Sequence, residues 1–432
     1  MIMGLNVYRN NKKVGLLDIE ANEPFYGFTY DSEYLAIETA QPLSLSLPLT
    51  ESRHSGSVAE PYFEGLLPEG DARDIISQRL GVPTGSSVKL LKALGRDCAG
   101  DIVIIDEDEK LVYDYFNNQQ YIFLSGGIKK IAQKPREEVP RLQEDMRLSL
   151  AGAQEKIALY HDPENDIKDG WYVPSQGAPS THIIKPGLRE AFYPSVTLNE
   201  FLCMRTAKNC GIQTANVYLL YPKTPVIIIQ RYDRTIDENV VNGFKTVTRI
   251  HQEDFCQATG IKSSLKYEQD GGPGFRQIRD LLSMYAKRPF EDVLTVVKLA
   301  VFNYLIGNCD AHAKNFSLLY NDDGSISLAP AYDLISSTIY DGRFGSKLSR
   351  GMAMRIGMHE NIDKINSEDF VIFARDISVR LQQIKIIGNE LIEKLPTAFS
   401  QAVTEAEKIG FSDAEMIMER ILTETGKRKM VF

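Results

Sequence analysis

The sequence predicts an α+β fold of two lobes, a β-rich first half followed by a helix-rich second half. Before residue 250, short β-prone runs separated by turn residues are typical of strands, as in LNVYRNNKKVGLLDIE. After it, long apolar runs such as VLTVVKLAVFNYLIG are typical of buried helices. The chain has 432 residues. Single cores seldom grow beyond about 250–300 residues, so we expect two or three domains.

Composition is that of an ordinary globular protein, with 43% hydrophobic and 25% charged residues. A net charge of −9 argues against a nucleic-acid footprint over the whole molecule, although a local basic patch remains possible. The five cysteines form no CxxC pair and predict reduced thiols. The sequence shows neither a signal peptide nor a membrane span. We therefore expect a cytoplasmic protein with no membrane partner.

Three domains are expected, at 1–120, 121–248 and 249–432. The first has short strands, the strand DIVIID and helical stretches that end on Gly81 and Gly95. The second is expected to be mostly strands, in RLSLAG, EKIALYH, WYVP, THIIKP, VYLLYP and PVIIIQRYDR. One amphipathic helix, NEFLCMRTAKNCG, is expected among them. The third is expected to be helical, interrupted by the two short strands NFSLLY and SISLAP.

A dense set of polar residues, GNCDAHAKNF at 307–316, directly follows the most apolar predicted helix. Phosphoryl transfer requires phosphates to be held, a divalent metal to be placed and the acceptor hydroxyl to be aimed. Protein kinases place a base Asp and a metal-binding Asn on one loop as D-x-x-x-x-N, the spacing of Asp310 and Asn315. The pair alone fits a polar helix cap equally well, because such common residues match by chance about once in a chain of this length.

A second carboxylate favours the phosphoryl-transfer interpretation. Asp333 in APAYDLISS follows the predicted strand SISLAP. Magnesium prefers hard oxygen ligands and bridges phosphate oxygens, so a further metal-binding Asp is expected here. A chance combination would seldom preserve the order of helix, Asp loop, Asn, strand pair and Asp.

Three other segments could supply the rest of an ATP site. The small residues of RLSLAGAQEKIALY allow backbone amides to approach phosphates, although an ordinary hairpin turn is the simpler interpretation. Lys185 ends the strand THIIKP and could reach the α- and β-phosphates or be only an edge charge. PVIIIQRYDR could form a hinge, in which the backbone of Gln230 and Tyr232 bonds adenine. Asp233 could then bond a ribose hydroxyl or simply end a strand.

Taken together, these segments resemble the HipA-like serine/threonine kinases, toxins of type II toxin–antitoxin modules. In the first domain the resemblance rests on QPLSLSLPL, FEGLLPEGDAR and GRDCAGDI. In the catalytic part it rests on LSLAGAQEK, HIIKP, NEFLCM, QRYDR, HQEDFCQATG, DGGPG, GNCDAHAKNFSLL and APAYDLISS. It covers essentially the whole chain. It implies a protein-kinase-like two-lobed fold: a β-rich N-lobe with an extra N-terminal subdomain, and an all-helical C-lobe.

The resemblance also implies a role for each matching residue. Asp310 would be the catalytic base, and Asn315 and Asp333 would hold Mg²⁺. The residues that would bind ATP are Ala151, Gly152, Ala153, Gln154, Glu155, Lys156, Lys185, Gln230, Tyr232, Asp233, His312, Asn315, Tyr332 and Asp333. Ser149 matches the autophosphorylation site of the family. A phosphate there adds about −1.5 to −2 charge and would compete with ATP. The hinge reads QRYDR where the family often has ERFDR, which matters little because the expected bonds are to backbone.

The implied activity is ATP-dependent phosphorylation of a serine or threonine on another protein. By resemblance the target is glutamyl-tRNA synthetase, whose phosphorylation would halt translation and favour persistence and multidrug tolerance. The implied partners are a helix-turn-helix antitoxin similar to HipB and operator DNA through or beside it. Two alternatives are a small-molecule phosphotransferase of the aminoglycoside-kinase type and a catalytically inactive corepressor. The segment RFGSKLSRG at 343–351 is either an activation segment or a solvated loop.

Overall fold

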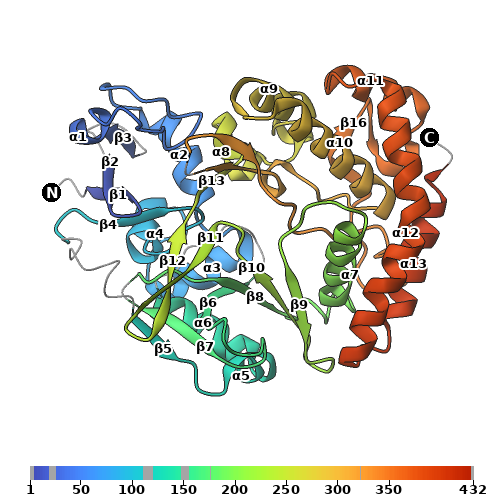
Figure 1. Cartoon of the computed structure of the whole chain (residues 1–432), viewed down its shortest axis with the longest axis horizontal. Coiled ribbons are helices and arrows are strands. Elements are labelled where there is room, and N and C mark those ends of the chain that lie inside the picture. Colours follow the sequence, from blue (N-terminus) through green and yellow to red (C-terminus); the bar gives the residue numbers. More distant parts are fainter. Residues whose placement is uncertain are drawn as a thin grey trace. The chain divides into compact units, whose positions relative to one another are not determined.

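The computed structural model has a mixed α and β fold, as predicted, and Figure 1 labels its elements. It describes residues 4–18, 26–109, 120–146, 155–175, 177–321 and 323–429. The chain forms two compact units. The first comprises Met1–Lys185, Gln230–Ser264 and Leu318–Ser325, and the second Pro186–Ile229, Leu265–Ser317 and Ile326–Phe432. The first unit draws on all three expected domain ranges, and the three-domain division stays a prediction.

The N-terminal part of the first unit is an antiparallel sheet with helices packed around one apolar core. The strands are β1 (Leu5–Arg9), β2 (Lys12–Asp18), β3 (Gly27–Tyr30) and β4 (Ile102–Asp106), in the order β3-β2-β1-β4. The helices are α1 (Ser32–Leu35), α2 (Gly56–Gly65), α3 (Gly70–Leu80) and α4 (Ser87–Leu94). The predicted helical stops at Gly81 and Gly95 are confirmed, since these residues cap α3 and α4.

Four further strands of the first unit are neighbours in the order β5-β7-β6-β8 and pair antiparallel. These strands are β5 (Gln120–Phe123), β6 (Ile157–His161), β7 (Trp171–Ser175) and β8 (His182–Pro186). Helices α5 (Gly127–Gln133) and α6 (Pro135–Met146) pack against them. The remaining elements are β11 (Arg234–Val241), β12 (Phe244–Arg249), β13 (His251–Asp254), α8 (Phe255–Thr259) and most of β14 (Ser317–Tyr320).

Helices α5 and α6 were not expected from the sequence, which predicted mainly strands after residue 121. Prolines and glycines around them are strong signals for turns. Pro135, however, occupies the first position of α6, where a missing N–H costs nothing. The predicted strand RLSLAG lies outside the described residues.

The second unit is mainly helical. Its helices are α7 (Val196–Asn209), α9 (Phe275–Tyr285), α10 (Pro289–Ile306), α11 (Ser367–Asp376), α12 (Leu381–Ile409) and α13 (Ala414–Gly426). Helix α10 packs against α9, α12 and α13, and α12 packs against α7 (Figure 1). The strands are β9 (Val217–Leu220), β10 (Val226–Gln230), β15 (Ile326–Leu328), β16 (Gly351–Ile356) and β17 (His359–Asn361). The lobe expected to be all-helical therefore also contains strands, among them the antiparallel pair β16 and β17.

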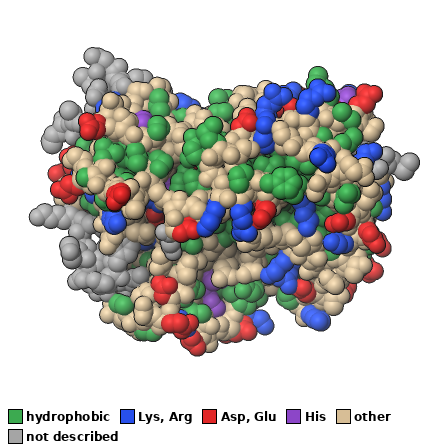
Figure 2. All heavy atoms as spheres, turned by 45° about the horizontal axis from the view of Figure 1, so that its top comes forward, with side chains coloured by type: hydrophobic (Ala, Val, Ile, Leu, Met, Phe, Trp, Pro, Cys, Tyr) green, Lys and Arg blue, Asp and Glu red, His purple; other side chains and the backbone are tan. Residues whose placement is uncertain are grey.

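Two surface properties bear on partners. Figure 2 shows basic and acidic side chains intermixed over one face of the described residues, in keeping with the net charge of −9. No helix in the described part of the chain is long and apolar enough to cross a membrane.

Candidate active site

The loop at 308–315 begins where the buried helix α10 ends. Almost every side chain in the second half of α10 is buried, and the helix is capped by Gly307 with a φ of 75°. A Cβ on Gly307 would lie 1.9 Å from Oγ1 of Thr338, so glycine is required both by conformation and by space. The carbonyl of Gly307 accepts hydrogen bonds from the amides of Ser337 (3.0 Å) and Thr338 (3.1 Å). The loop therefore starts from a fixed point at the edge of the core.

Asp310 is an exposed carboxylate on a fixed backbone. Its amide donates to Oδ1 of Asn308 (3.1 Å), and its carbonyl accepts from the amide of His312 (2.8 Å). The hydroxyl of Tyr267 donates to Oδ1 of Asp310 (2.9 Å), the one carboxylate contact recorded among the described residues. Oδ2 is therefore the oxygen that can accept a proton from an approaching hydroxyl.

Asn315 lies in the 3₁₀ turn Ala313–Asn315. Its Nδ2 donates to the carbonyl of Asp310 (3.1 Å), so the amide oxygen is the atom left to act as a ligand. Oxygen is the donor that Mg²⁺ prefers, and Mg²⁺ usually completes its shell with substrate phosphates and water. No group of three or more His, Cys, Asp and Glu side chains forms a ready metal site within the described residues. A single amide oxygen and a carboxylate fit the share that a protein normally contributes.

Asp333 has a positive φ of 58°, which is uncommon for a residue with a Cβ. Strain of this kind clusters at functional sites. The strand-like segment before it is anchored, because Ala331 forms a parallel bridge with Thr214. The amide of Ala331 donates to the carbonyl of Gln213 (2.8 Å), and the amide of Ala215 donates to the carbonyl of Ala331 (2.9 Å).

Tyr332 connects the two predicted metal ligands. Its hydroxyl donates to the carbonyl of Lys314 (2.6 Å), next to Asn315, and lies 2.6 Å from Oγ of Ser317. The segment that carries Asp333 is thus tied to the loop that carries Asn315. Five predicted site residues lie in the second unit: Asp310, His312, Asn315, Tyr332 and Asp333.

Tyr267 is a site residue that the sequence did not reveal. Besides donating to Asp310, its ring makes an edge contact with His312, with centroids 5.6 Å apart. Its carbonyl accepts from the amides of Asp270 (3.0 Å) and Gly272 (2.9 Å). The DGGPG stretch, one of the motifs that carry the family resemblance, therefore forms the turn that presents Tyr267. That glycine-rich turn was the signal in the sequence that could have pointed to Tyr267.

The other predicted nucleotide residues belong to the first unit. Lys185 lies in β8 and is buried. The carbonyl of Lys156 accepts from Nε2 of Gln143 (2.8 Å), which fixes the start of β6, beside Glu155. Gln230 ends β10, and Tyr232 donates through its hydroxyl to Oε1 of Gln252. Residues outside the described part are Ser149, Ala151, Gly152, Ala153 and Gln154. All these nucleotide roles stay predictions.

Asp233 is 3% exposed, and protein groups surround its carboxylate. Nε of Arg231 donates to Oδ1 (2.9 Å), while Nη2 of Arg231, Nη1 of Arg234 and the amide of Gly100 lie 2.7, 3.0 and 2.8 Å from Oδ2. Burial raises the pKa of Asp233, but the two arginines outweigh burial and hold the pKa below its ordinary value. The carboxylate predicted to bond ribose is therefore buried and already held by protein groups.

Asp97, from the GRDCAGDI stretch, completes the same buried cluster. Its Oδ1 accepts from Nη2 of Arg234 (3.0 Å) and from Nε and Nη2 of Arg249 (both 3.2 Å). Its Oδ2 accepts from Oγ of Ser180 (2.6 Å) and from Nη1 of Arg231 (3.5 Å). Burial opposes ionisation, yet the arginines hold the pKa of Asp97 well below its usual range. Three arginines and two carboxylates thus join the N-terminal residues to the hinge segment.

Glu253 is another buried carboxylate of the first unit, 1% exposed. It accepts hydrogen bonds from Oγ of Ser44 (2.5 Å), the amide of Leu45 (3.0 Å) and the hydroxyl of Tyr320. Burial raises the pKa of Glu253 to about 7, although these bonds oppose the rise. The QPLSLSLPL stretch, which contains Ser44 and Leu45, is therefore held against β13 by hydrogen bonds to Glu253.

Glu253→Gln is expected to remove a pH dependence of stability. The folded pKa of about 7 exceeds the ordinary 4.5, so the wild type loses stability as pH rises through this window. The full loss is roughly 3.5 kcal/mol, at about 1.4 kcal/mol per pKa unit. A glutamine can accept from Leu45 and Tyr320 and donate to Ser44 without carrying charge. Denaturant unfolding at about pH 5 and about pH 8 should therefore show a smaller difference in the free energy of unfolding for the variant.

Glu38→Gln, which changes an exposed carboxylate, is the control and should keep the wild-type difference. Equal pH differences in all three proteins would contradict the raised pKa of Glu253.

Comparison with known proteins shows which family this chain resembles over its length. The HipA-like C-terminal domain model matches residues 148–399, and the HipA N-terminal domain model matches residues 5–105. The putative kinase Y4mE of Sinorhizobium fredii is 35% identical over 99% of this chain and 98% of its own length. The serine/threonine-protein kinase toxin HipA of Shewanella oneidensis is 29% identical over 78% of this chain and 76% of its own.

A solved structure shares the fold over nearly the full length. It is HipA in the HipA, HipB and operator DNA complex of Shewanella oneidensis, with a TM-score of 0.78 at 23% identity. The match covers 98% of this chain and 97% of that one. With both family models matched and a 35% identical relative matched over 98% of its length, the chain belongs to the HipA family of kinases.

Proposed function

We propose that this kinase transfers the γ-phosphate of ATP to a serine or threonine hydroxyl on another protein, with Asp310 as the catalytic base. The observation that supports it most is the loop at 308–315. It holds an exposed carboxylate on a hydrogen-bonded backbone, while Asn315 donates through its amide nitrogen and keeps its oxygen for a metal. A polar helix cap would not require an exposed acid held by a tyrosine from a distant turn.

In the proposed mechanism, Oδ2 of Asp310 accepts the proton of the acceptor hydroxyl as its oxygen attacks the γ-phosphorus and the bond to ADP breaks. Tyr267 orients the carboxylate through Oδ1. Asn315 and Asp333 would hold Mg²⁺, which when bound offsets the negative charge of the phosphates. Glu155, Lys156, Lys185, Gln230, Tyr232, Asp233, His312 and Tyr332, with residues 151–154, would bind the nucleotide.

We also propose that Ser149 is an autophosphorylation site that switches the kinase off. It precedes the small-residue stretch expected to bind the ATP phosphates. A phosphate adds about −1.5 to −2 charge and would repel or displace the phosphates of ATP.

The proposed partners follow from the relatives. One relative is named a kinase toxin, and a solved relative was captured with HipB and operator DNA. We propose that this chain likewise pairs with a helix-turn-helix antitoxin in the cytoplasm and meets operator DNA beside it. The proposed substrate is glutamyl-tRNA synthetase, whose phosphorylation would halt translation and promote persistence.

The test uses purified protein with ATP and Mg²⁺, with and without glutamyl-tRNA synthetase, read by intact mass and peptide mapping. We expect phosphate on Ser149 of the kinase and on a serine or threonine of the synthetase. Ser149→Ala should remain unmodified and stay active after preincubation with ATP, while wild type loses activity.

Two results would contradict this proposal. Phosphorylation of an aminoglycoside, with no protein phosphorylated, would favour the small-molecule kinase. No ATP consumption by folded protein would favour the inactive corepressor. If Ser149→Ala were no more active than the phosphorylated wild type, the switch alone would fail.

A further inference from the structure

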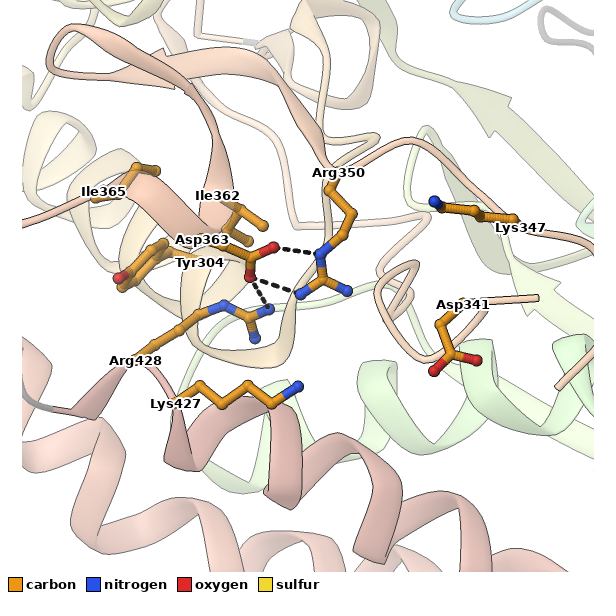
Figure 3. A pocket seen from close by; sticks show the side chains of 9 residues that line it. All are labelled: Tyr304, Asp341, Lys347, Arg350, Ile362, Asp363, Ile365, Lys427 and Arg428. Carbon is orange, nitrogen blue, oxygen red and sulfur yellow. Dashed lines mark hydrogen bonds and ion pairs between the residues drawn. The ribbon is translucent and has the colours of Figure 1, made fainter. Parts of the chain in front are cut away.

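A pocket of about 480 Å³ in the second unit brings together cations from two parts of the chain (Figure 3). Lys347 and Arg350 belong to the segment that follows Asp333, and Lys427 and Arg428 lie at the end of α13. In Figure 3 the ammonium groups of Lys347 and Lys427 point toward the guanidinium of Arg350 from two sides. The RFGSKLSRG segment therefore forms a wall of a basic pocket.

The pocket has a surplus of positive charge. Its lining contains four cations and two carboxylates, Asp341 and Asp363, which leaves two positive charges in excess. Two further groups outside the lining offset one another in charge: Glu424, which pairs with Arg350, Lys427 and Arg428, and Arg343, which pairs with Asp341. Within the described residues, Lys347 has no recorded ion pair.

Arg428 adds a second, independent observation. It is 2% exposed, and its Nη2 donates to Oε2 of Glu424 (2.9 Å). Its Nε has no hydrogen-bond partner within the described residues. A buried guanidinium N–H without a partner costs free energy, and the arginine that carries it lines the pocket.

We propose that this pocket binds a phosphate dianion, as inorganic phosphate or as the phosphate group of a small molecule. Two excess positive charges match the charge of a dianion. Guanidinium forks suit phosphate oxygens. Arg350 already donates to Asp363 through Nε and Nη2, and the two lysines add point charges from two other sides. The volume exceeds that of one phosphate group, which leaves room for the rest of a small phosphorylated compound.

The pocket is linked to the catalytic loop by hydrogen bonds. Nη1 of Arg428 lies 3.4 Å from the carbonyl of Leu305, in the last turn of α10. Nη1 of Arg350 donates to the carbonyl of Thr338 (3.1 Å), whose amide donates to the carbonyl of Gly307 (3.1 Å). A bound phosphate would fix both guanidinium groups and thereby the end of α10. An influence of the bound phosphate on catalysis rests on the proposed function. The binding of phosphate itself is independent of that function.

The test is calorimetric titration of the full chain with inorganic phosphate and, separately, with ribose 5-phosphate, at constant ionic strength. The nucleotide site is first saturated with Mg²⁺ and a non-hydrolysable ATP analogue. We expect one saturable phosphate per chain in the wild type. Lys347→Gln and Lys427→Gln should each weaken binding about tenfold, because each removes one exposed charge from the pocket. Tighter binding of ribose 5-phosphate than of phosphate would identify a phosphorylated small molecule as the natural ligand.

Lys408→Gln is the matched control, since this exposed lysine near the end of α12 does not line the pocket. It should bind phosphate as the wild type does. Deuterium exchange should report phosphate-dependent protection of 305–315 in the wild type and in Lys408→Gln only. Equal affinity in all four proteins, or no saturable phosphate in the wild type, would overturn the proposal. Failure of the proposed function would be seen separately, because the ATP analogue would then not bind in the step that precedes the phosphate titration.

Discussion

Asp310→Asn is expected to lower the rate of phosphate transfer about 10²–10⁴-fold while leaving ATP binding nearly unchanged. The amide has the size of the carboxylate and can still accept the hydrogen bond from Tyr267, so the loop should keep its shape. It cannot take the proton of the acceptor hydroxyl, however. Initial rates of labelled phosphate transfer, with ATP affinity measured by calorimetry, check both parts.

Two further variants test whether the effect of Asp310→Asn is specific to the catalytic base. Tyr267→Phe removes only the hydroxyl that orients the carboxylate, so a loss of about tenfold is expected, with the base itself intact. Asp280→Asn changes an exposed carboxylate on α9 and should leave the rate as it is. A wild-type rate for Asp310→Asn would remove Asp310 from the role of base. A large loss of ATP affinity would assign it to nucleotide binding instead.

Asp97→Ala is expected to destabilise the folded chain by about 3–5 kcal/mol, the usual cost of breaking a buried ion pair by removing one partner. The substitution would leave Arg231 and Arg234 buried with Asp233 as their remaining carboxylate, and it would remove the ion pair between Arg249 and Asp97. Each of the three arginines is at most 7% exposed, so water cannot readily replace the lost acceptor. Denaturant unfolding gives the free-energy difference directly.

The matched control is Asp108→Ala, at an exposed position beyond β4 in the same region. It should change the free energy of unfolding by less than about 0.5 kcal/mol. If Asp97→Ala were equally mild, the cluster would not be a source of stability. Asp97→Asn should lie between the two, because it keeps an acceptor for the arginines but loses the charge.

Helix α10 and the polar loop that follows it could be predicted because their signals are local. The apolar run of α10, the glycine at 307 and the spacing of Asp310 and Asn315 all lie within one short stretch. Asp333 could be placed because a predicted strand pair separates it from Asn315 in the expected order.

Other features could not be predicted, because tertiary contacts determine them. The bond from Tyr267 to Asp310 joins residues 43 positions apart, and no periodicity reports such a pair. Asp233 was expected to bond a ribose hydroxyl or to end a strand, and Asp97 was not singled out, since a sequence does not show that arginines surround them. Helix α6 was missed because Pro135 and Pro140 outweighed its helical pattern.

The buried arginine cluster also determines how this chain can recombine with its relatives. The N-terminal family model ends at residue 105, which suggests a module that could be exchanged on its own. Yet Asp97 lies on one side of that border and its three arginine partners lie on the other. A chimera that takes its N-terminal region from a relative must keep both halves of this charge arrangement. Gene exchange at this border is therefore constrained by a few matched residues rather than by the length of the segment.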